Sequence, residues 1–172
     1  FLGQFGNDTV YVNLNNLPAH TAAIVTFELA VIRTWDGSED GDAWQISADG
    51  ITLLSTDFAN AETHWNTRTQ AYPGTLGVGQ YVPRSGIAET NTLGYEQDTV
   101  YRMSFVIPHA TSTLSFAFSG SGLEELSNES WALDNVLVRL ISSVDNDLFG
   151  AARNISNLPY SYTQDINGST VT

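Results

Sequence analysis

The sequence contains no cysteine and no lysine, and its six basic residues are all arginine. Without cysteine there are no disulfides, no thiol nucleophile and no thiolate metal ligand. Without lysine there is neither a P-loop lysine nor an amine for Schiff-base chemistry. Nineteen acidic residues give a formal net charge of -13. A surface of that sign repels the phosphate backbone, so nucleic acid is not an expected partner.

Long apolar segments and helical periodicity are also scarce. No apolar run approaches the ~20 residues that a membrane-spanning helix needs, so membrane insertion is not expected. The first residues, Phe1-Leu2-Gly3, lack the basic start and long apolar stretch of a signal peptide. Either a signal was removed, or the numbering begins inside a precursor. A chain of 172 residues with 42% hydrophobic content suits one domain with an extension.

The dominant pattern is an alternation of apolar and polar side chains, which is typical of strands with one buried face. Asp49-Gly50 lies between two such segments and is a strong signal for a two-residue hairpin. The segment from Ala59 to Gly94 shows no alternation, and a connection of that length usually carries function or packs as an ordered loop. Strands are predicted over residues 9–14, 22–33, 44–48, 51–57, 99–107, 114–118 and 130–140.

Roughly seven or eight antiparallel strands in one domain predict an all-β fold, a two-sheet antiparallel jelly-roll sandwich over residues 1–141. Residues 142–172 form an extended C-terminal tail, which begins with a linker around Asp145. About thirty residues cannot build a core of their own. The tail therefore packs on the body, pairs with another chain, or opens a further domain.

The acidic segment from Asp36 to Asp42 predicts a calcium site. Oxygen-bearing side chains at alternate positions with a glycine at the sixth wrap a chain around a hard cation, as in an EF-hand loop. The resemblance to an EF-hand fails at the twelfth position, which is Ser47, and the flanking segments are predicted strands. We therefore expect a calcium loop of a β-sandwich that borrows ligands from elsewhere, and the alternative is a solvated acidic turn. The expected ligands in this segment are Asp36, Ser38, Asp40 and Asp42.

Two further acids complete the predicted calcium site. Asp134 shares its alternation phase with Val136, Val138 and Leu140, which places it on the inward face of its strand. An inward carboxylate is costly unless it is paired or bound to a metal, and arginine is scarce here. Glu129 lies just before this strand and adds another oxygen. The alternative for Asp134 is a loop-capping role through backbone N–H groups.

Aromatic side chains in the long irregular segment offer a different function. Trp65, Tyr72 and Tyr81 could act as platforms for the apolar face of a sugar ring, although aromatics that anchor the core are the commoner case. Glu124, Glu125 and Glu129 resemble a glycosidase carboxylate pair only superficially, so no catalytic residues are predicted. The histidines at positions 20, 64 and 109 show no metal-ligand spacing. Glycosylation sequons begin at Asn7, Asn128, Asn154 and Asn167 and are weak evidence for export.

Several motifs resemble those of extracellular β-sandwich modules of environmental bacteria. They are Phe1-Leu2-Gly3-Gln4-Phe5-Gly6-Asn7, Thr34-Trp35-Asp36-Gly37, Asp42-Ala43-Trp44, Asn91-Thr92-Leu93-Gly94-Tyr95 and Glu129-Ser130-Trp131-Ala132-Leu133-Asp134-Asn135-Val136. The resemblance covers about residues 1–140. It implies a jelly roll of a large secreted or surface protein without enzymatic activity, and therefore an extracellular or cell-surface location.

The tail resembles the first strands of bacterial pre-peptidase-type β-sandwich repeats, on Asn146-Asp147-Leu148-Phe149-Gly150 and the segment from Leu158 to Asp165. An incomplete repeat of this kind could donate its strand to the open sheet edge of a neighbour. Repeated head-to-tail donation does not close and gives a fibre. The expected assembly residues are Leu158, Tyr160, Tyr162 and Ile166. The leading hypothesis is thus a calcium-stabilised structural module that forms a homo-oligomeric fibre, and the alternative is a carbohydrate-binding or adhesive module.

Overall fold

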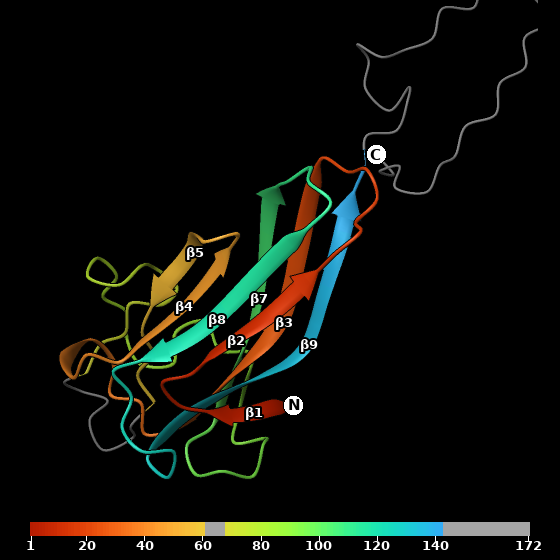
Figure 1. Cartoon of the computed structure of the whole chain (residues 1–172). Coiled ribbons are helices and arrows are strands. Elements are labelled where there is room, and N and C mark those ends of the chain that lie inside the picture. Colours follow the sequence, from red (N-terminus) through yellow and green to blue (C-terminus); the bar gives the residue numbers. More distant parts are fainter. Residues whose placement is uncertain (61–67, 143–172) are drawn as a thin grey trace, which may run out of the picture.

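A computed structural model describes residues 1–60 and 68–142 as two antiparallel β-sheets packed face to face (Figure 1). One short 3₁₀ helix, η1 (Gly37–Glu39), precedes β4. The strands are β1 (Leu2–Phe5), β2 (Thr9–Leu14), β3 (Ala22–Arg33), β4 (Ala43–Ala48), β5 (Ile51–Thr56), β6 (Glu89–Thr90), β7 (Thr99–Pro108), β8 (Leu114–Ser121) and β9 (Glu129–Ile141). No helix in this part of the chain is long and apolar enough to cross a membrane.

The strand order confirms the predicted jelly roll. One sheet has the order β1-β9-β3-β7-β6 and the other β2-β8-β4-β5. β1 to β4 alternate between the two sheets, β4 and β5 form a hairpin within one sheet, and β7 to β9 alternate again. Each sheet thus interleaves strands from both halves of the sequence. This is the double Greek-key arrangement of a jelly roll.

The core lies between the two sheets and is rich in aromatic rings. The alternation of β3 buries Val25, Phe27 and Leu29, and β8 buries Phe116 and Phe118 opposite them. Three tryptophans in this core have no exposed surface: Trp35, Trp44 and Trp131. The rings of Trp44 and Trp131 meet edge to face at a centroid distance of 6.3 Å. Burial of this apolar area is the main term that holds the sheets together.

The hairpin predicted at Asp49-Gly50 is confirmed, because these two residues join β4 to β5. Both adopt positive φ, 47° and 80°, as a type I′ turn requires. Between β5 and β6 the described residues, 57–60 and 68–88, form no strand, and β6 belongs to the five-stranded sheet and not to the sheet of β5 (Figure 1).

The edges of the five-stranded sheet are covered over only part of their length. β1 pairs with β9 from Trp131 to Leu133, and β6 pairs with β7 only at Thr99 and Val100. In the described chain, the rest of β9 and of β7 have no strand on these sides.

Candidate functional site

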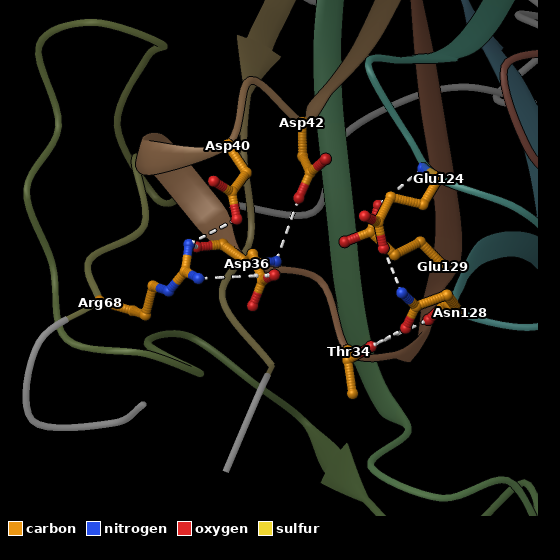
Figure 2. A network of polar contacts seen from close by, with 8 residues as sticks. All are labelled: Thr34, Asp36, Asp40, Asp42, Arg68, Glu124, Asn128 and Glu129. Atoms are coloured by element: carbon orange, nitrogen blue, oxygen red, sulfur yellow. Dashed lines mark hydrogen bonds and ion pairs between the residues drawn. The ribbon is translucent and has the colours of Figure 1, made fainter. Parts of the chain in front are cut away.

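The predicted calcium segment lies at an acidic corner of the sandwich, where three stretches of chain meet (Figure 2). Asp36 and Asp40 flank η1, Asp42 directly precedes β4, and Glu129 is the first residue of β9. The corner is anchored to the core because the indole N–H of Trp35 donates to the backbone oxygen of Ser130 at 2.9 Å. Residues far apart in the sequence are thereby held together at the start of β4 and β9.

Asp42 and Glu129 form a buried carboxyl pair. Their exposed fractions are 2% and 1%, and each carboxyl group lies close enough to shift the pKa of the other. Asp42 also accepts from the backbone N–H of Asp36 at 3.0 Å, and Glu129 accepts from that of Glu124 at 2.9 Å. Burial raises the pKa of Glu129 to about 8, and repulsion from Asp42 adds to this shift. Burial also raises the pKa of Asp42, and repulsion from Asp36 and Asp40 adds to that shift. At neutral pH the pair therefore holds a proton.

Asp36 and Asp40 face Arg68, which was not among the predicted site residues. Arg68 lies 2.8 Å from Asp40 through Nη1 and 3.6 Å from Asp36 through Nη2. Its Nη1 also donates to the backbone oxygen of Asp36 at 3.3 Å. The signal in the sequence was faint, because a single arginine within a long irregular segment does not show which acids it will meet.

Ser38 turns away from the other expected ligands. Its hydroxyl donates to the carboxylate of Asp57, with distances of 3.2 and 3.0 Å to the two oxygens. Asp57 is fully buried, and burial raises its pKa. It also accepts from the backbone N–H of Ala71 at 2.7 Å, so it holds the part of the long loop around Ala71 against the end of β5.

Within the described residues, no three His, Asp or Glu side chains are arranged to hold a metal ion. Of the expected calcium ligands, four share the acidic corner: Asp36, Asp40, Asp42 and Glu129 (Figure 2). Ser38 lies within η1 and bonds to Asp57 instead. As they stand, two of these acids face Arg68 and two face each other.

The prediction that Asp134 faces the core is wrong. A β-bulge shifts the register between β3 and β9, since Thr26 pairs with Leu137 but Glu28 pairs with Asp134. The extra residue in β9 breaks the phase that links Asp134 to Val138. Its side chain is 50% exposed and lies 3.3 Å from the N-terminal amine. The hydrogen bond from the backbone N–H of Asn135 lowers its pKa.

Of the three aromatic residues predicted to bind sugar, two lie in the described chain, and only one of these is exposed. Trp65 lies outside the described residues. Tyr72 packs against Phe58 and Tyr101 at ring-centroid distances of 5.2 and 5.0 Å, which makes it an anchoring aromatic. Tyr81 is 42% exposed, and two backbone hydrogen bonds of 2.9 and 2.8 Å join it to Gln70.

Two of the sequon asparagines lie in the described chain, and both make side-chain hydrogen bonds. Asn7 donates to the backbone oxygen of Leu123 at 2.7 Å and accepts from its N–H at 2.9 Å. Asn128 bonds to Thr34 and Glu124 at the acidic corner. Asn154 and Asn167 lie outside the described residues, as do the expected assembly residues Leu158, Tyr160, Tyr162 and Ile166.

Comparisons with protein-family models, with curated proteins and with solved structures find no match for this chain.

Proposed function

We propose that this protein is a non-enzymatic extracellular structural module that assembles head-to-tail into a fibre, as the bacterial surface modules it resembles would imply. The observation that carries the proposal is the uncovered edge of β9. β1 leaves β9 at Leu133, and residues 134–141 have no strand on that side in the described chain. Unpaired N–H and C=O groups on a sheet edge are a template for an added strand.

The side chains along this edge suit an added strand. Val136 is 38% exposed, and Val138 and Leu140 are only partly buried although they pack against the core. An added strand with apolar residues at alternate positions would cover them. Leu158, Tyr160, Tyr162 and Ile166 have that spacing in the tail.

Electron microscopy of the purified full chain tests the assembly. Filaments are expected, and they should disappear when Tyr160→Lys and Tyr162→Lys are combined. Ser161→Lys with Thr163→Lys adds the same charge on the other alternation phase and should leave the filaments intact. Monomers from the unmodified chain, or filaments that survive the tyrosine substitutions, would refute tail-mediated assembly.

The acceptor edge has its own matched pair of variants. Val136→Asp places a charge on the uncovered edge of β9 and should prevent filament growth. Val106→Asp changes an exposed valine of β7, which lies at the other side of the same sheet, and should not. Equal effects of the two substitutions would argue against β9 as the acceptor.

Calcium is the second part of the proposal. A divalent ion would replace the proton that the buried Asp42–Glu129 pair otherwise needs, and Asp36 lies next to that pair. The ion would fasten the start of β4 to the start of β9 in a chain that has no cysteine for a disulfide.

A carbohydrate-binding or adhesive role is the second candidate. It is favoured by Tyr81, an exposed ring held in place by its two backbone hydrogen bonds with Gln70. Glycan-array binding that is lost in Tyr81→Ala but kept in Tyr11→Ala would support this role, because Tyr11 is an exposed aromatic on a different strand. Binding that is absent, or equally affected by both substitutions, would oppose it.

A further inference from the structure

Arg33, the last residue of β3, has a guanidinium group without a hydrogen bond or ion pair to any described part of the chain. Its Nε is buried and has no acceptor. Its Cζ lies 5.7 Å from the ring centroid of Tyr95, a cation–π contact. Arg68 and Arg102, by contrast, each meet two carboxylates. A buried donor without an acceptor is costly and calls for an explanation.

This arginine lines a small hollow next to the acidic corner. The hollow measures about 160 Å³. Thr34 and Asn128 bond to each other in its wall, and Asn128 also bonds to Glu124 of the corner (Figure 2). Because Nε is the buried nitrogen of the guanidinium group, the two Nη atoms are the ones open to a ligand. Two charged and four neutral polar residues line the hollow: Arg33, Glu96, Thr34, Gln97, Ser127 and Asn128.

The backbone around Arg33 is fixed by contacts with other segments. Its φ of 71° is uncommon for a residue other than glycine. The buried side chain of Asn60 donates to its backbone oxygen at 3.0 Å, and the next N–H, of Thr34, donates to the oxygen of Asn128 at 3.1 Å. An uncommon backbone conformation that its surroundings enforce is frequent at binding sites. The guanidinium group is therefore held in place before any ligand arrives.

The charges and size of the hollow favour a small ligand with one negative charge. A planar guanidinium group matches a carboxylate or a phosphate. Glu96 lies in the same hollow, and the chain carries a net charge of -13. Repulsion from these charges grows with the charge of the ligand, so a carboxylate is favoured over a dianion such as phosphate. The volume is below the roughly 300–1,000 Å³ of most ligand pockets, which suits a single small unit.

We propose that Arg33 anchors a binding site for a sugar that carries a carboxylate, such as a uronic acid. The carboxylate bonds to the Nη atoms, and the amides and hydroxyls of the hollow suit the hydroxyl groups of the sugar. An acidic side chain of a second copy also supplies a carboxylate, but it brings the net charge of that copy with it. The site uses no residue of the fibre proposal and does not include Tyr81, so its failure would leave both of those proposals standing.

NMR titration of the full chain at constant ionic strength tests the site. Glucuronate should shift the Nε–H signal of Arg33 and the side-chain amide signals of Gln97 and Asn128 until they saturate, and glucose should not. Arg33→Gln should weaken the binding about tenfold or more, because a charged hydrogen-bond donor is lost. Arg139→Gln, at an exposed arginine of β9, should leave it unchanged. Glu96→Gln should strengthen it about threefold, because a repelling charge is removed.

Four results would overturn the proposal. They are no saturable shift with glucuronate, an equal response to glucose, tighter binding of inorganic phosphate, and equal losses in the two arginine variants. Acetate that binds as tightly as glucuronate would also overturn it, since the hollow would then recognise a bare carboxylate, such as an acidic side chain of another protein. The comparisons among glucuronate, glucose, phosphate and acetate use the unmodified chain, so they decide the question even if the Arg33 variant fails to fold.

Discussion

The buried carboxyl pair shows how one residue can reverse the usual pH dependence of stability. Most acids form partners on folding, which lowers their pKa, so stability is lost on acidification. Glu129 has the opposite shift, from its usual 4.5 to about 8, because burial penalises its charged form. The folded state keeps a proton that the unfolded chain releases between these two values. The contribution of Glu129 is therefore present at low pH and lost as the pH rises through about 8.

Glu129→Gln should make the protein more stable at pH 8 and flatten the pH dependence of unfolding. The amide keeps an oxygen for the N–H of Glu124 and donates to Asp42 without carrying charge. We expect a melting temperature about 2–4 °C higher at pH 8 and little change at pH 5. Calorimetry in calcium-free buffer across this range measures the difference. Glu124→Gln, at an exposed neighbour, is the control, and equal shifts in both variants would contradict the assignment.

Gly120 is a second residue whose identity the structure explains. The strand predicted over residues 114–118 is longer in the structure, where β8 continues through Gly120 to Ser121. A Cβ atom at this position would lie 2.6 Å from the backbone oxygen of Gly6 and 2.6 Å from Nε1 of Trp131. These two atoms already form a 2.7 Å hydrogen bond that ties β9 to the β1–β2 connection.

Gly120→Ala should therefore destabilise the fold by about 1–3 kcal/mol, as overpacking of a filled core does. Chemical denaturation measures this free energy of unfolding. Ser121→Ala changes the next, exposed position of the same strand and should stay within about 0.5 kcal/mol of the unmodified protein. A similar cost for both substitutions would mean that the strand, and not the close approach at Gly120, sets the effect.

At the scale of elements, the connection between β6 and β7 depends on one buried carboxylate. Asp98 has no exposed surface and accepts from the backbone N–H groups of Thr92, Leu93 and Tyr95 at 2.9, 3.1 and 3.1 Å. Leu93 and Tyr95 in turn pack on the outer face of β3 over Ala30 and Ile32. The carboxylate thus closes a loop that covers this part of the sheet.

Asp98→Ala should release that loop, because three backbone donors lose their acceptor. We expect a loss of about 2–3 kcal/mol in the free energy of unfolding and faster cleavage by proteases between residues 91 and 97. Glu96→Ala, an exposed acid in the same loop, should show neither effect. Unchanged cleavage in the Asp98 variant would show that apolar packing alone holds the loop.

The elements most visible in the sequence were those with uninterrupted alternation. The bounds predicted for residues 9–14 and 22–33 agree with β2 and β3, since one face of each strand meets the core. β1 was missed because it has only four residues, and an irregularity between Gly3 and Phe5 leaves it without alternation of exposed and buried side chains. Asp134 was misplaced because a bulge moves every later residue of β9 to the opposite phase. The acids of the corner were identified, but their division between Arg68 and the buried pair depends on tertiary contacts that spacing does not encode.

At the scale of the whole molecule, the charge of -13 affects every experiment with added ions. Self-repulsion among like charges destabilises a compact state, and any salt screens it. A rise in melting temperature with calcium is therefore not by itself evidence for a bound ion. The comparison needs sodium chloride at the same ionic strength, and it needs a variant that lacks the carboxyl pair.

Calcium should stabilise the protein beyond matched sodium chloride, and more strongly at pH 8 than at pH 5. At pH 5 the ion must displace the proton from the Asp42–Glu129 pair, whereas at pH 8 that proton is already weakly held. By linkage, an ion at 100 times its dissociation constant adds about 2.7 kcal/mol to the free energy of unfolding. Asp42→Asn should remove the calcium-specific part and keep the general effect of salt. Asp134→Asn, on the exposed side of β9, should change neither. Equal stabilisation by calcium and by sodium chloride in the unmodified protein would show that the Asp42–Glu129 pair binds no calcium ion. The pair would then be only a pair of carboxyl groups that share a proton.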